Sequence, residues 1–106
     1  MKDKKLKALE LQLAEKYDKH CHDYKKNMGY TIYLKEPLKF GENVKPGELN
    51  YFDTDALEIY GFYTWKGCII LTDGCGDGDM DHMLSDTEAK KFLDYISDEK
   101  NLKFEH

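Results

Sequence analysis

The sequence predicts an α+β domain, in which a small antiparallel sheet of three to five strands carries a long N-terminal helix and a C-terminal helix. Two observations predict this class. Apolar residues recur at helical spacing near both ends of the chain, and segments rich in β-branched and aromatic residues lie between them. A length of 106 residues is the usual size of one domain. Residues 1–106 are therefore expected to form a single α+β domain.

The N-terminal segment has an apolar residue at every third or fourth position, which is typical of a helix that buries one face. This stripe consists of Leu6, Leu9, Leu13, Tyr17, Cys21, Tyr24 and Met28. Asn27 or Gly29 is the expected helix end, because both residue types tolerate the left-handed conformation found there. A second helix is predicted after Ser85, which forms a Ser-x-x-Glu capping box with Glu88. Its expected apolar face consists of Ala89, Phe92, Leu93 and Ile96.

The middle of the chain is expected to be strands and turns. Residues 29–35 alternate as a strand does, whereas residues 36–50 contain both prolines and are expected to be loop with at most an edge strand. Residues 55–65 and 68–72 predict a β-hairpin with Lys66-Gly67 as its two-residue turn. The apolar run from Cys68 to Leu71 favours a central strand. Residues 73–88 are expected to be an acidic loop, and residues 101–104 a short last strand.

Aromatic residues are concentrated in the predicted hairpin. Strict alternation would place Ile59, Gly61, Tyr63 and Trp65 on one face, and Tyr60, Phe62 and Thr64 on the other. One face must be core, and the aromatic side chains left on the other face indicate a contact surface, because tyrosine and tryptophan are favoured anchors in protein interfaces.

The charge composition bears on the class of partner. The formal net charge is −5, and all sixteen basic residues are lysine. Without arginine an acidic domain is a poor nucleic-acid binder, but it suits a basic protein surface. The expected partner is therefore another protein, such as a basic nucleic-acid-binding nuclease. No apolar run is long enough to span a membrane, and the N-terminal residues lack the pattern of a signal peptide, which predicts a cytoplasmic protein.

Cysteine and histidine residues predict a metal site. Three cysteines, an odd number, favour free or metal-bound thiols over a disulfide framework. Zinc takes pairs of thiolate and imidazole ligands from separate segments. The predicted ligands are Cys21, His22, Cys75 and His82. His20 is an alternative to His22, and one of Asp77, Asp79 and Asp81 could replace a ligand. Cys68 is expected in the core.

Calcium is the alternative metal. Residues 77–88 resemble an EF-hand loop, with acidic residues at positions one, three and five and a glutamate at position twelve. These residues are Asp77, Asp79, Asp81 and Glu88. His82 stands at position six, where the turn of such a loop normally has glycine. Zinc and calcium both stay open from the sequence.

No pattern in the sequence indicates catalysis, so a non-enzymatic protein is expected. The glycines of residues 74–79 lack the Gly-Lys-Ser/Thr ending of a phosphate-binding loop. The aspartates of residues 73–88 have no neighbouring lysine or arginine to stabilise a leaving phosphate.

Two families share features with this chain. The segment CIILTDGCGDGD, residues 68–79, resembles the strand and GCG stretch of SMI1/KNR4-type immunity proteins. The chain as a whole is similar to small phage-encoded anti-CRISPR proteins in its size, its lysines without arginine, its acidic residues 73–88, its tyrosine-rich hairpin and its Cys/His clusters. That resemblance implies a zinc-stabilised inhibitor that binds a CRISPR effector nuclease in the host cytoplasm and blocks nucleic-acid loading. The alternatives are a calcium-binding module and a toxin-binding immunity protein.

Overall fold

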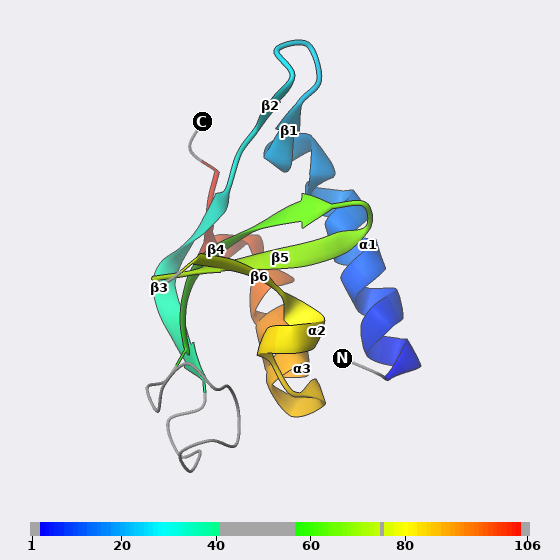
Figure 1. The fold of residues 1–106 in the computed structure, drawn as a ribbon, viewed down its shortest axis with the longest axis vertical. Coiled ribbons are helices and arrows are strands. Elements are labelled where there is room, and N and C mark those ends of the chain that lie inside the picture. The colour runs from blue at the N-terminus through cyan, green and yellow to red at the C-terminus, as the bar shows by residue number, and fades with distance from the viewer. Residues whose placement is uncertain (1–2, 41–56, 75, 105–106) are drawn as a thin grey trace.

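The computed structural model of the chain describes residues 3–40, 57–74 and 76–104. Three α-helices, a 3-10 helix and seven strands follow one another along these residues (Figure 1). Their order is α1 (Lys4–Cys21), β1 (His22–Asp23), β2 (Met28–Gly29), β3 (Ile32–Phe40), β4 (Leu57–Trp65), β5 (Cys68–Asp73), β6 (Gly76–Asp79), α2 (Met80–Met83), α3 (Asp86–Ile96), η1 (Glu99–Asn101) and β7 (Leu102–Lys103).

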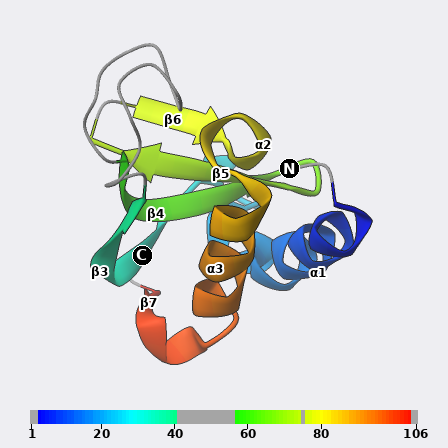
Figure 2. The ribbon, with the colours of Figure 1, turned by 90° about the horizontal axis from the view of Figure 1, so that it is seen from below.

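The α+β class is confirmed. Five strands form an antiparallel sheet in the order β6-β5-β4-β3-β7, and β1 and β2 form a separate two-stranded ribbon. Figure 2 shows α1 and α3 on the same side of the five-stranded sheet. The strand β5, predicted to be central, does lie between two neighbours, and the predicted short last strand is β7 at one edge.

The core lies between the two long helices and the sheet. Tyr17 of α1, Phe62 of β4 and Phe92 of α3 are fully buried and meet edge to face, with ring centroids 5.7 Å and 6.0 Å apart. The Tyr17 hydroxyl donates to the carbonyl oxygen of Ile96 over 2.5 Å, which satisfies its polar end. All four residues of the predicted apolar face of the second helix are buried, and its Ser85–Glu88 capping box is present.

The first helix is shorter than its apolar stripe predicts. It ends at Cys21, and the next residue, His22, is already extended. The carboxylate of Asp23 accepts hydrogen bonds from the backbone N–H groups of Lys25 and Lys26, and Asn27 has a left-handed φ of 53°. These local bonds compete with helix and close a tight turn between β1 and β2. The expected helix end at Asn27 or Gly29 was therefore wrong.

The predicted hairpin is confirmed as β4 and β5. Lys66 and Gly67 both have positive φ, 50° and 79°, as a two-residue turn of this kind requires. The assignment of β4 side chains to the two faces of the sheet was partly wrong. The β4–β5 pairing shifts between Ile59 and Gly61, so that Tyr60 is an extra residue on β4. A bulge of this kind breaks the alternation, and Ile59 is buried in the same core cluster as Phe62.

The acidic segment is not a continuous loop, contrary to the prediction. It contains β6, which pairs with β5 from Ile70 to Asp73, and the single-turn helix α2. Residues 36–40, predicted to be loop or edge strand, extend β3, and the rest of that stretch falls outside the described residues. Among the described helices none is both long and apolar enough to cross a membrane.

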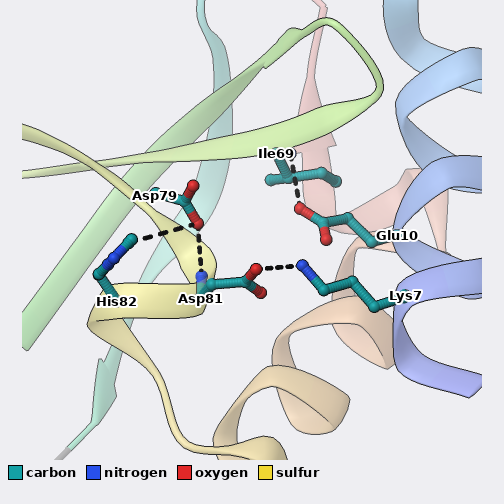
Figure 3. Close-up of polar contacts among 6 residues, drawn as sticks. All are labelled: Lys7, Glu10, Ile69, Asp79, Asp81 and His82. Carbon is teal, nitrogen blue, oxygen red and sulfur yellow. Dashed lines mark hydrogen bonds and ion pairs between the residues drawn. The ribbon is translucent and has the colours of Figure 1, made fainter. Parts of the chain in front are cut away.

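The end of the β4–β5 hairpin projects beyond its neighbours in the sheet. Pairing of β4 with β3 begins at Phe62, and pairing of β5 with β6 begins at Ile70. Two backbone groups of this projecting end are satisfied by side chains of α1 and its cap. The backbone N–H of Ile69 donates to Glu10 Oε2 over 2.8 Å (Figure 3), and the carbonyl oxygen of Thr64 is 2.9 Å from His22 Nε2. Glu10 is only 3% exposed, so α1 and the hairpin are held together by buried polar contacts.

Glu10 should make stability fall as the pH rises. Burial raises the pKa of its carboxyl above the usual 4.5, an effect that the hydrogen bond from Ile69 opposes. A carboxyl whose pKa is higher in the folded state stabilises the fold below its unfolded pKa, and this contribution is lost as the pH rises through the folded pKa. Glu10→Gln keeps an acceptor oxygen but cannot ionise. We expect urea denaturation between pH 4 and 8 to show this fall in the wild type and a flatter profile in Glu10→Gln.

The exposed Glu15→Gln on the same helix is the matched control and should keep the wild-type profile. Glu10→Ala should lower the free energy of unfolding by about 1–3 kcal/mol, because it leaves the buried N–H of Ile69 without its acceptor. Parallel pH profiles for wild type and Glu10→Gln would contradict this account.

Candidate functional site

The predicted zinc ligands do not come together among the described residues. Cys21 and His22 lie at the C-terminal end of α1, whereas His82 lies in α2. The neighbour of His82, Asp81, forms an ion pair with Lys7 near the start of α1 (Figure 3). Cys21 follows about 21 Å further along that helix, at 1.5 Å per residue. Cys75 falls outside the described residues.

Each described ligand candidate is in a different environment. Cys21 is fully buried, and this burial raises the pKa of its thiol. His22 Nε2 lies within hydrogen-bond distance of the Thr64 carbonyl oxygen, so this nitrogen carries the proton and donates. The His82 side chain is 85% exposed, with Nδ1 4.0 Å from Asp79 Oδ1. In the part of the chain that the structure describes, no three His, Cys, Asp or Glu residues are grouped so as to hold a metal ion.

The acidic residues proposed for calcium have local structural contacts. Asp79 is the N-cap of α2 and accepts from the backbone N–H of Asp81 over 2.6 Å. Glu88 accepts from the backbone N–H of Ser85 over 3.0 Å as part of the capping box. The carboxylate of Asp81 pairs with Lys7. Partial burial acts to raise the pKa of this carboxyl and the hydrogen bond from Lys7 acts to lower it, and the pKa lies below its ordinary value. Strand β6 and helix α2 thus replace the loop that an EF-hand needs.

A groove lies between the β1–β2 ribbon and the β4–β5 hairpin. It has a volume of about 430 Å³, which lies within the range of ligand and anchor pockets. The β1–β2 ribbon and the segment after it line one side with Tyr24, Met28 and Tyr30, and β4 lines the other with Tyr63 and Trp65. Tyr24, Met28 and Trp65 are 73%, 51% and 54% exposed. Large apolar side chains with this exposure, gathered around one hollow, are typical of a binding surface.

Asp18 helps to position the ribbon beside the groove. Its Oδ2 accepts from the Tyr24 hydroxyl over 2.6 Å, and its Oδ1 accepts from the Thr64 hydroxyl over 3.4 Å. The Tyr24 ring also stacks on His22, with centroids 5.7 Å apart and planes 29° apart. The hydrogen bond to the Asp18 carboxylate raises the pKa of Tyr24. The last turn of α1 therefore fixes both walls of the groove.

On the β4 side of the groove, Tyr63 is less exposed than Trp65 and lies near a carboxylate. Tyr63 is half-buried, and its pKa is raised first by burial and then by the nearby Asp77. The groove thus presents aromatic faces, one thioether, hydroxyl groups and the carboxylate of Asp23, and Asp77 lies beside Tyr63. These groups can hold an apolar or cationic side chain by packing, cation–π contact and hydrogen bonding.

The residues of this groove were recognised from the sequence only in part. A contact surface of hairpin aromatic residues was expected without a choice of its face, and Tyr24 and Met28 were assigned to the buried face of the first helix. The signal against a longer helix was the segment from Asp23 to Asn27, whose end residues favour turns.

No protein family, curated protein or solved structure matches this chain.

The zinc hypothesis predicts a measurable metal content. Elemental analysis of the purified protein should find about one zinc ion per chain, and Cys75→Ser should lose it, because a thiolate ligand is removed. Cys21→Ser is a weaker test, since this residue is fully buried and its replacement disturbs packing. Cys68→Ser is the matched control and should retain the metal. Bound calcium with freely titratable thiols would favour the alternative metal, and absence of both metals would contradict both hypotheses.

Proposed function

We propose that this chain is a non-enzymatic protein-binding domain that occludes a basic partner, and that the groove between its two hairpins is the contact surface. The observation that carries the proposal is the set of exposed side chains around this hollow. Tyr24, Met28 and Trp65 come from two separate hairpins, yet they converge on one cavity. Aromatic and methionine side chains are the anchors that protein interfaces favour.

The charge of the chain supports a basic partner. A net charge of −5 attracts a positive surface at long range and raises the rate of encounter. Asp77 is the acidic residue of residues 73–88 that lies beside a groove ring, Tyr63. Asp79, in contrast, caps α2, and Asp81 pairs with Lys7 of α1. The direct electrostatic contact is therefore assigned to Asp77.

The narrower proposal is that the partner is a CRISPR effector nuclease, blocked before it loads nucleic acid. It rests on the resemblance in size, charge and aromatic content to small phage-encoded anti-CRISPR proteins. The alternative partner is a toxin, as for SMI1/KNR4-type immunity proteins. Both partners are proteins, and both proposals use the same groove.

Trp65→Ala tests the groove directly. In a binding assay with purified CRISPR effector nucleases, we expect it to weaken the complex at least about tenfold, since loss of an interface anchor commonly costs 2 kcal/mol or more. Its thermal stability should stay near that of the wild type, because the ring is more than half exposed. Tyr33→Ala is the control, because Tyr33 is also half exposed but does not line the groove.

Equal losses of affinity for Trp65→Ala and Tyr33→Ala would place the interface elsewhere. Binding of the wild type to none of the effectors would overturn the narrower proposal, and the same two variants would then be tested against basic toxin domains.

Charge reversal at Asp77 tests the electrostatic contact. We expect Asp77→Lys to slow association with the basic partner and to reduce the dependence of affinity on salt, because one attractive pair becomes repulsive. Glu15→Lys, on the exposed face of α1, changes the net charge by the same amount and is the control. The proposal predicts a larger effect for Asp77→Lys, and identical effects would show that net charge alone acts.

A further inference from the structure

A second hollow at the β1–β2 ribbon shares His22, Asp23, Tyr24 and Tyr30 with the groove but has a different chemistry. Its volume is about 480 Å³, also within the range of small-ligand sites. Three lysines line it, Lys19 from the last turn of α1 and Lys25 and Lys26 from the turn of the ribbon. Tyr24, Tyr30 and His22 supply the rings. In a chain of net charge −5 this is a local concentration of positive charge.

Three lysines and one acidic residue, Asp23, line the hollow, so positive charge is in excess there. None of the three forms an ion pair with another residue of the described ranges. The acidic residue of the lining, Asp23, directs Oδ1 to the backbone N–H groups of Lys25 and Lys26. The helix dipole accounts for a lysine at position 19, but not for Lys25 and Lys26, which lie beyond the helix.

An aromatic platform stands beside the lysines. The Tyr24 ring is 73% exposed and stacks on His22, which fixes its orientation from one side. The Tyr24 hydroxyl is also held by Asp18. A ring in this position can stack on a planar heterocycle, as aromatic side chains do with nucleobases, while ammonium groups bind phosphate oxygens.

We infer that this hollow binds a mononucleotide, with its phosphates on Lys19, Lys25 and Lys26 and its base on Tyr24. The hollow shares Tyr24 with the groove, but the inference does not depend on the proposed protein-binding function.

Titration calorimetry with three probes tests this assignment. We expect ADP to bind the wild-type chain, pyrophosphate to bind about fivefold or more weakly because it lacks the stacking ring, and adenosine to bind more weakly still. The affinity for ADP should fall as salt is raised, since the lysines are exposed. Absence of ADP binding at millimolar concentration would overturn the inference, and so would equal affinity for ADP and pyrophosphate.

Variants separate the two parts of the site. K25E/K26E should weaken ADP binding at least about tenfold by removing charge-assisted hydrogen bonds, whereas Lys91→Glu, an exposed lysine of α3, should change it less than about twofold. Tyr24→Ala should weaken ADP about fivefold but leave pyrophosphate unchanged. Equal effects of K25E/K26E and Lys91→Glu would overturn the site. Tighter binding of a single-stranded oligonucleotide than of ADP would contradict a mononucleotide as the ligand and would favour a nucleic-acid strand.

Discussion

Two hydrogen bonds between α1 and the projecting end of the β4–β5 hairpin determine the geometry around it. Ile69 donates to Glu10, and the Thr64 carbonyl oxygen pairs with His22. Both backbone groups lie beyond the paired parts of the neighbouring strands. A buried backbone group without a partner costs about 1–3 kcal/mol, so the position of the helix relative to the hairpin is strongly constrained. Glu10 lies in the first half of α1 and His22 directly follows its last residue, so together they fix the direction of the helix as well.

The groove follows from the same constraint. His22 reaches Thr64 from an extended conformation, directly after the last helical residue. The ribbon that starts there carries Tyr24 and Met28 away from the core and toward Trp65. Residues that would have been buried in a longer helix thus become an exposed lining. The lysines of the ribbon turn are exposed for the same reason.

Local signals were sufficient for several elements. The Lys66-Gly67 turn, the capping box of α3 and the apolar face of that helix were all predicted from short stretches, because each depends on residues a few positions apart. The candidate site was predictable only in part. An aromatic contact surface on the hairpin could be predicted, though not which face forms it, and the counting of aspartates in residues 77–88 suggested a metal loop where the structure has a strand and a capped helix.

Composition and periodicity by themselves determined the class of the domain, its two long helices and its central hairpin, because hydrophobic burial follows sequence spacing. Only the tertiary structure decided where α1 ends, which acidic residues are used internally and which aromatic residues remain exposed. These depend on partners distant in sequence. Thr64 is 42 residues from His22, and Asp81 is 74 residues from Lys7. Spacing along the chain cannot encode such pairs, since it is the packing of helix on sheet that brings them together.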